Sequence, residues 1–186
     1  MTGIPMERPA QFGSREHLTP EEFAERLAGG TAEYCAERGY LLLPEVERLL
    51  DDGDYERAAT VASRAAAIAE QCGDTDLLAC AQHQHGRALL ARNEIAGGLA
   101  LLDEMMLPVT AERLSPVVTG LMYCSVISAC QAVCAAGRAH EWTRALSDWC
   151  ARQPEMLAFT GACLVHRAEI LRLHGAWDAA LEEALR

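Results

Sequence analysis

Apolar residues near the C-terminal end of the chain recur at the spacing of an amphipathic helix. The stretch FTGACLVHRAEILRLHGAWDAALEEALR, residues 159–186, carries two such stripes on either side of Gly175. Their apolar positions are Leu164, Ala168 and Leu171, then Trp177, Ala180, Leu181 and Ala184. Glycine accepts the left-handed backbone conformation that ends many helices. The pattern therefore predicts two antiparallel helices joined by a tight turn.

The same pattern occurs in YLLLPEVERLLDDGDYERAATVASRAAAIAEQCG, residues 40–73. One stripe contains Leu42, Leu43, Val46, Leu49 and Leu50, and the next contains Tyr55, Ala58, Val61, Ala62, Ala65 and Ala69. Gly53 is placed to form the turn, Asp54 to cap the second helix and Gly73 to end it. The spacing Gly-Asp-Tyr-x-x-Ala is typical of the turn in a tetratricopeptide hairpin.

Hairpins of this kind are predicted along the chain, at about residues 40–73, 74–107, 115–152 and 155–186. We assign their turns to Gly53, Asn93, Gly137 and Gly175, which are 40, 44 and 38 residues apart. These intervals exceed the ~34 residues of an ideal tetratricopeptide repeat and drift along the chain. The predicted fold is therefore all-α, a divergent tetratricopeptide-like α-solenoid of about four helix hairpins.

The repeat domain is expected to span residues 19–186, with a short helical N-terminal extension before the hairpins. Residues 1–18 mix proline, glycine and charge without a period, as an irregular arm does. Thr19-Pro20-Glu21-Glu22 then matches a capping box that opens a short helix, and a second short helix is expected over 31–38. The connection from Met106 to Ser115 is longer than the others, and is either a functional loop or a slack connector.

Charge and composition argue against several classes of protein. The net charge of -11 argues against nucleic-acid binding, because phosphate contacts need clustered cations. All of the cationic residues are arginine, so a Walker A loop and a Schiff-base lysine are excluded. Apolar runs are far shorter than the ~20 residues of a membrane-spanning helix, and the N-terminal sequence lacks a signal-peptide core. We therefore expect a cytoplasmic protein.

Cysteine is frequent, with eight residues at Cys35, Cys72, Cys80, Cys124, Cys130, Cys134, Cys150 and Cys163. None forms a C-x-x-C pair. Without a secretion signal, these side chains are expected to be small buried thiols rather than disulfides or zinc ligands. Cys130 and Cys134, four residues apart on one helix, could share a metal ion, but no histidine pair supplies the remaining ligands. We therefore expect no metal and no cofactor.

Four segments of the sequence resemble segments of a known protein family. They are GYLLLPEVERLLDDGDYERA, GLMYCSVISACQAV, WCARQPEMLAFTGACLVHRAEI and LHGAW. From about Gly39 onward, the chain resembles the tetratricopeptide-like helical region of large actinobacterial LuxR-type transcriptional regulators. The resemblance implies a sensory or protein-interaction segment. In such regulators a P-loop module can precede this region and a DNA-reading helix-turn-helix follows it. This chain has no P-loop, and too little follows Gly175 for a DNA-binding domain, so DNA binding is not carried over.

The first helices of stacked hairpins line a concave face, and polar residues on them are candidate ligand contacts. The repeat register places there Tyr40, Glu47, His83, Arg87, Gln131, Glu169 and Arg172. Such a row suits a peptide, a protein or a small polar effector, since buried hydrogen bonds must be matched. The alternative is a solvated face with ordinary ion pairs. His166 is expected to be a satisfied core histidine rather than a catalytic base.

Two features of the third hairpin leave alternatives open. The helix from Pro116 to Ala136 is apolar nearly all round, interrupted by Ser125, Ser128 and Gln131, as expected of a central helix covered on both sides or of a ligand pocket. Trp142 and Trp149 lie seven apart, and packing is favoured over a docking patch.

No arrangement of catalytic residues stands out, so a non-enzymatic interaction module is the first hypothesis. An enzyme or small-molecule-binding protein of secondary metabolism is the second. A homodimeric assembly protein is the third. Whether Arg186 ends a complete protein or a fragment stays open.

Overall fold

The computed structural model describes residues 35–153, 157–173 and 175–185. All regular structure in these ranges is helical and none of it is strand, so the all-α prediction is confirmed. The predicted arm at 1–18 and the helix expected after Thr19 lie outside the described residues. The helix predicted over 31–38 is described only from Cys35, where α2 (Cys35–Tyr40) begins.

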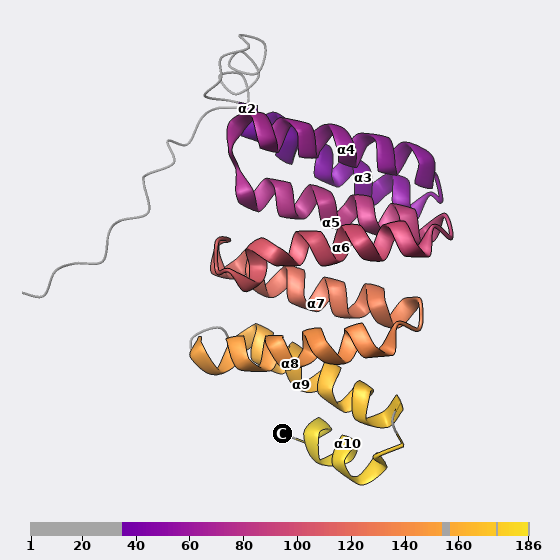
Figure 1. Ribbon diagram of the computed structural model, residues 1–186, viewed down its shortest axis with the longest axis vertical. Coiled ribbons are helices and arrows are strands. Elements are labelled where there is room, and N and C mark those ends of the chain that lie inside the picture. Colours follow the sequence, from indigo (N-terminus) through magenta and orange to yellow (C-terminus); the bar gives the residue numbers. More distant parts are fainter. Residues whose placement is uncertain (1–34, 154–156, 174, 186) are drawn as a thin grey trace, which may run out of the picture. The chain divides into compact units, whose positions relative to one another are not determined.

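Consecutive helices follow one another with short connections (Figure 1). After α2 come α3 (Leu42–Asp51), α4 (Tyr55–Cys72), α5 (Thr75–Ala91), α6 (Ile95–Thr110), α7 (Pro116–Ala132), α8 (Ala136–Arg152), α9 (Leu157–Leu173) and α10 (Trp177–Ala184). The pairs α3–α4, α5–α6, α7–α8 and α9–α10 correspond to the hairpins predicted at 40–73, 74–107, 115–152 and 155–186. The prediction of a helix from Pro116 to Ala136 is too long, because α7 ends at Ala132 and Ala136 is the first residue of α8.

The turn inside each of these pairs has the same backbone hydrogen bonds. In the first, the N–H of Gly53 donates to the Leu50 carbonyl at 3.2 Å and the N–H of Asp54 donates to the Leu49 carbonyl at 2.9 Å. This is the Schellman arrangement, in which two amides after the helix satisfy its last carbonyls. The residue at its centre has a positive φ, and these residues are Gly53, Asn93, Cys134 and Gly175.

The prediction of Gly137 as the third turn residue is wrong. Gly137 lies within α8, and the left-handed residue is Cys134, with φ 58°. The turn residues Gly53, Asn93, Cys134 and Gly175 are therefore 40, 41 and 41 positions apart, and the predicted drift disappears. The error arose because glycine is the usual left-handed residue, whereas this turn holds a cysteine in a conformation that costs most side chains about 1–2 kcal/mol.

The predicted long connection between the second and third hairpins is also shorter than expected. α6 continues through Pro108 to Thr110, so only residues 111–115 link it to α7. The backbone N–H of Ser115 donates to Asp76 Oδ1 at 2.9 Å, and the Thr75 hydroxyl donates to the Arg113 carbonyl at 3.4 Å. The connection is therefore anchored to the first turn of α5.

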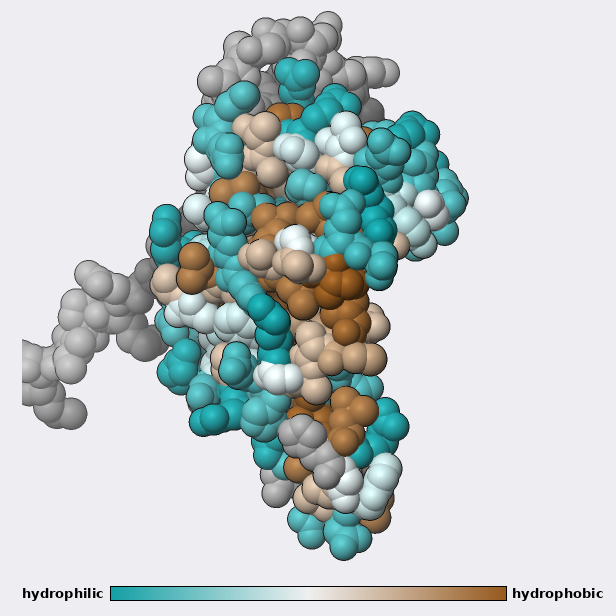
Figure 2. Space-filling view, turned by 45° about the vertical axis from the view of Figure 1, so that its right-hand side comes forward, coloured by the Kyte–Doolittle hydropathy of each residue, from teal (hydrophilic) through white to brown (hydrophobic). Residues whose placement is uncertain are grey.

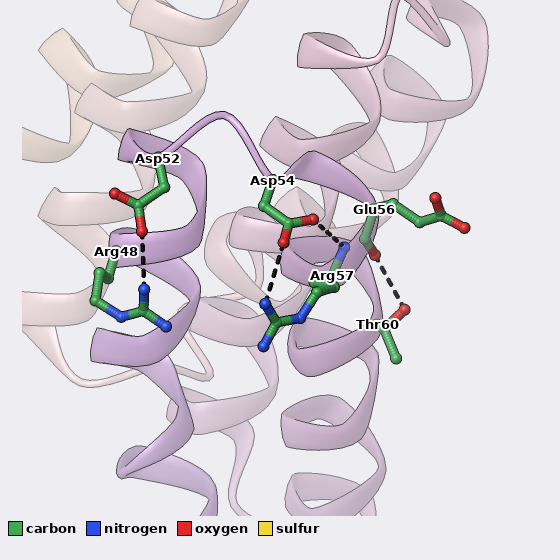
Figure 3. A network of polar contacts seen from close by, with 6 residues as sticks. All are labelled: Arg48, Asp52, Asp54, Glu56, Arg57 and Thr60. Carbon is green, nitrogen blue, oxygen red and sulfur yellow. Dashed lines mark hydrogen bonds and ion pairs between the residues drawn. The ribbon is translucent and has the colours of Figure 1, made fainter.

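Side-chain caps begin several of these helices. Asp54 accepts a hydrogen bond from the Arg57 backbone N–H at 3.3 Å and also pairs with the Arg57 guanidinium, as Figure 3 shows. Asp74 caps α5 through the Leu77 N–H at 2.9 Å, and Ser115 caps α7 directly before Pro116. Each cap satisfies an amide that has no partner within its own helix, and the sequence predicted the cap at Asp54.

The helices pack in an ordered series. Each contacts the next along the chain, and α3, α5, α7 and α9 form a second set in which α3 contacts α5, α5 contacts α7 and α7 contacts α9. Neighbours in the chain therefore lie side by side (Figure 1). The first helix of each hairpin thus has a first helix beside it, which brings residues about 40 positions apart into contact.

Two apolar clusters form the core. One, between α3, α4 and α5, is built mainly from small side chains: Val46, Leu49, Ala58, Ala59, Val61, Ala62 and Ala88. The other extends from α5 to α9 and holds bulkier groups such as Met105, Ile127 and Trp149. Trp149 is 3% exposed, and its ring centroid lies 6.3 Å from that of Tyr123. Trp142 packs half-buried against the same cluster, so packing, rather than a docking patch of two indoles, is confirmed.

The cysteines are mostly thiols, as expected, with two corrections. Cys80, Cys124, Cys130, Cys134, Cys150 and Cys163 are thiols, but Cys134 is exposed rather than buried, and Cys72 is disulfide-bonded. None of the described helices is long and apolar enough to cross a membrane.

Candidate functional site

The helices α3, α5, α7 and α9 carry most of the residues predicted to form a binding face. Glu47 lies on α3, His83 and Arg87 on α5, Gln131 on α7, and Glu169 and Arg172 on α9. Because each of these helices contacts the next of the set, polar residues on neighbouring members can meet directly.

Glu47 joins α3 to α5. Its Oε1 accepts a hydrogen bond from Arg87 Nη1 at 2.6 Å and another from Gln84 Nε2 at 3.1 Å. Gln84 Nε2 also donates to the Leu43 carbonyl at 3.2 Å. Glu47 and Arg87 were both predicted to lie on the concave face, and Gln84 was not predicted. Its position three residues before Arg87, on the same side of the helix, is the signal that could have identified it.

Gln131 joins α7 to α9 in the same way. Its Nε2 donates to Glu169 Oε2 at 3.0 Å, and His166 Nδ1 lies 3.7 Å from that oxygen, beyond hydrogen-bond distance. His166 is 8% exposed, and burial lowers its pKa against the opposing effect of Glu169. His166 is thus a buried histidine beside a carboxylate, as expected of a core residue. Its Nδ1 has no hydrogen-bond partner among the described residues, so the expectation that it is satisfied is wrong.

Between these two bridges, α5 and α7 border an open cavity of about 660 Å³. The α5 side contributes His83, Arg87, Leu90 and Ala91, and the α7 side contributes Cys124, Ser125, Ser128, Ala129, Ala132 and Val133. The volume lies in the range of small-molecule pockets. Figure 2 shows a face of the molecule where apolar surface gathers between polar margins.

His83 is the most unusual side chain of the cavity. It is 6% exposed, and its Nε2 has no hydrogen-bond partner among the described residues. Burial, and secondarily the charge of Arg87, lowers its pKa to about 3, so the imidazole is neutral at pH 7. A buried polar atom without a partner costs free energy, which a ligand that supplies the missing hydrogen bond would recover.

Two predicted residues do not join this arrangement. The Tyr40 hydroxyl donates to Asp74 Oδ1 at 3.3 Å, at the N-terminal end of α5, and burial together with Asp74 raises the pKa of Tyr40. Arg172 is exposed near the end of α9, and no described side chain pairs with it. Both lie outside the cavity lining. The repeat register therefore misplaced Tyr40, which ends α2, and placed Arg172 on the expected helix but near its exposed end.

The helix α7 departs from the prediction of a helix covered on both sides. Val126 and Ile127 are fully buried, but Val117 and Leu121 are 57% and 47% exposed. Ser125 and Ser128, which interrupt its apolar pattern, line the cavity. Those interruptions were the sequence signal for a pocket, the second of the two alternatives for this helix.

The chemistry of the lining favours binding. Burial raises the pKa of the Cys124 thiol, which keeps it protonated and a weak nucleophile. Within the described ranges, no group of three histidine, cysteine or acidic residues is placed to hold a metal ion. Comparison with protein-family models, curated proteins and solved structures found no match to this chain.

Proposed function

We propose that the chain is a non-enzymatic interaction module, a tetratricopeptide-like helical repeat that holds a ligand against α3, α5, α7 and α9. Its partner is a peptide, a protein or a small effector. Two observations support the repeat character. The turn residues recur at intervals of 40, 41 and 41 positions, and the first helices contact one another in order. Both are expected of stacked hairpins that bury a shared core.

One observation carries the proposal of binding: an open cavity lies between two polar bridges and is bordered by a buried histidine whose Nε2 has no hydrogen-bond partner among the described residues. Glu47 with Arg87, and Gln131 with Glu169, hold their side chains in place on either side. Such preorganised polar groups around an apolar pocket are typical of ligand sites, because side chains that are already fixed lose little conformational entropy when a ligand binds.

The resemblance to the helical region of LuxR-type regulators supports a sensory role in a cytoplasmic regulator. A small effector fits the cavity better than a long peptide, because the cavity is bordered by two helices rather than extending along all four. That same feature favours the second candidate function, a small-molecule-binding protein built on this scaffold. Catalysis is the less favoured use, since His83 is a weak base and the Cys124 thiol is protonated at pH 7.

The test is selection of ligands from a random peptide display library and from a metabolite mixture, using the full chain. Ala132→Trp introduces a bulky side chain at an exposed position of α7 that lines the cavity, and so fills the cavity. Ala67→Trp, at an exposed position of α4, is the matched control. Thermal unfolding confirms that both variants fold. We expect the selected ligands to bind the wild type and Ala67→Trp but not Ala132→Trp. Ligands that bind all three proteins equally would show that the cavity is not the site.

A further inference from the structure

A buried histidine borders the cavity between α5 and α7. His83 is part of the lining, and its buried Nε2 has no hydrogen-bond partner among the described residues. The titratable and charged groups that border the cavity with it are Arg87 on its own helix and Cys124 on α7, and Glu47 on α3 pairs with Arg87. Because the pKa of His83 is lowered, the ring is neutral at pH 7 and can donate one N–H.

The charge of the lining points to an anionic group beside this histidine. Arg87 is the charged residue of the described lining, and no carboxylate borders the cavity with it. Glu47 takes one hydrogen bond from Arg87 Nη1, whereas a guanidinium has five N–H donors in a planar fork. Arg87 can therefore keep its pair with Glu47 and still bind an acceptor inside the cavity.

The other walls are suited to an apolar group. Leu90, Ala91, Ala129, Ala132 and Val133 present aliphatic carbon, and the hydroxyls of Ser125 and Ser128 lie on the α7 side. A phosphate monoester carries nearly two negative charges near pH 7 and is poorly matched by one arginine in an acidic chain. A carboxylate carries one charge, and its two oxygens match an arginine fork.

We propose that this cavity binds a small amphipathic monocarboxylic acid, with its carboxylate against His83 Nε2 and the Arg87 guanidinium and its apolar part along Leu90, Ala129 and Val133. This inference rests on the proposed function and names the class of ligand. The carboxylate completes the hydrogen bonding of His83, and burial of the apolar part supplies the rest of the affinity.

The experiment compares octanoate with octanamide, which has the same chain and no charge, by calorimetric titration of the full chain at pH 7. Octanoate is expected to bind at least about 10-fold more tightly, because a charged hydrogen bond is worth more than a neutral one. In carbon-detected spectra, the imidazole signal of His83 is expected to shift as octanoate is added.

Variants of the cavity residues test where the carboxylate of octanoate binds. Arg87→Gln is expected to weaken octanoate binding roughly 10-fold or more and to leave octanamide nearly unchanged. His83→Phe removes the donor and also weakens octanoate binding, whereas His83→Gln, which keeps an N–H, retains part of it. Arg138→Gln is the matched control, since Arg138 pairs with Asp103 outside the cavity.

The outcomes separate this inference from the proposed function. If octanoate and octanamide bind equally and Ala132→Trp abolishes both, the cavity is a binding site but the carboxylate assignment is wrong. If neither compound binds, or if octanoate binding is unchanged in both Arg87→Gln and His83→Phe, the inference is overturned. The library selections then decide independently whether the protein binds a ligand of another class.

Discussion

Two of the helices that pack against α5, α6 and α7, meet it in different ways. Against α6 the contact is close, because Gly86 and Gly98 face each other. A Cβ on Gly98 would lie 2.7 Å from Leu90 Cδ2 and 3.0 Å from the Gly86 carbonyl oxygen. Against α7 the same helix presents His83 and Arg87 to an open cavity. The side of α5 that faces α6 is thus packed closely enough for the two backbones to approach each other. The side that faces α7 leaves space for a ligand.

This difference would let stacked hairpins be rigid and still leave space for the ligand that we propose. The α5–α6 contact lies within a hairpin, where absent side chains let the backbones approach and exclude water. The α5–α7 contact lies between hairpins, where longer polar side chains cannot interlock as closely. We therefore expect substitutions on the α6 side to change stability, and substitutions on the α7 side to change mainly binding and pH dependence.

The largest effect is expected for Leu102→Ala on α6. Leu102 is fully buried and packs against Gly86, so its truncation leaves a cavity and should lower the free energy of unfolding by roughly 2–5 kcal/mol. Leu107→Ala on the same helix is the control, because Leu107 is 66% exposed. Urea denaturation measures both. Equal losses in the two variants would contradict the close packing on this side.

A smaller effect is expected for Gly98→Leu, which forces α5 and α6 apart. Overpacking of this kind should lower the free energy of unfolding by about 1–3 kcal/mol. Gly97→Leu is the matched control: nothing lies within 4 Å of its added Cβ, so the gain in helix propensity should raise stability by roughly 0.5 kcal/mol. Opposite shifts of the thermal midpoint are the expected result, and shifts of the same sign would count against a close crossing.

On the α7 side, pH is the informative variable. The pKa of His83 is lowered to about 3 in the folded protein and is about 6.5 in the unfolded chain. Between about pH 3 and pH 6.5 the imidazole of His83 is therefore protonated in the unfolded chain but neutral in the folded protein. Stability is therefore full above about pH 6.5 and falls on acidification, by up to about 1.4 kcal/mol per pH unit.

Urea denaturation of the wild type and His83→Gln between pH 7 and pH 4.5 measures this slope. His85 and His166 also have lowered pKa values and titrate in both proteins, so the difference between the two slopes belongs to His83. Parallel slopes would mean that His83 is accessible to protons in the folded state.

The smallest effect is expected for Glu47→Gln. The side chains of Glu47 and Arg87 are 45% and 36% exposed, and such ion pairs contribute about 0–1 kcal/mol to stability. We expect a loss in that range by chemical denaturation, with Asp52→Asn, from the exposed pair with Arg48, as the comparison. A loss of more than about 2 kcal/mol would show that the Glu47–Arg87 bridge is a structural staple rather than part of a preorganised site.

Local signals were sufficient to predict helices and caps, but not every turn or contact. Stripes of apolar residues predicted the hairpins, and Asp54 was recognised as a cap because its side chain bonds an amide only three residues away. Cys134 was missed because its left-handed conformation is imposed by the two helices that it joins, not by its own preference. The disulfide at Cys72 was missed because no spacing in the sequence indicates it.

The sequence by itself determined that the chain is helical, where most helices begin and end, and that Glu47, His83, Arg87, Gln131 and Glu169 belong to one set of helices. Those properties depend on periodicity and on bonds between near neighbours in the chain. Only the tertiary structure decided that Gln84 joins Glu47, that Tyr40 and Arg172 lie apart, and that Ser125 and Ser128 face His83 across a cavity. Such contacts join residues about 40 positions apart, and their geometry depends on how closely the helices pack, which in turn depends on the volumes of side chains from several helices at once.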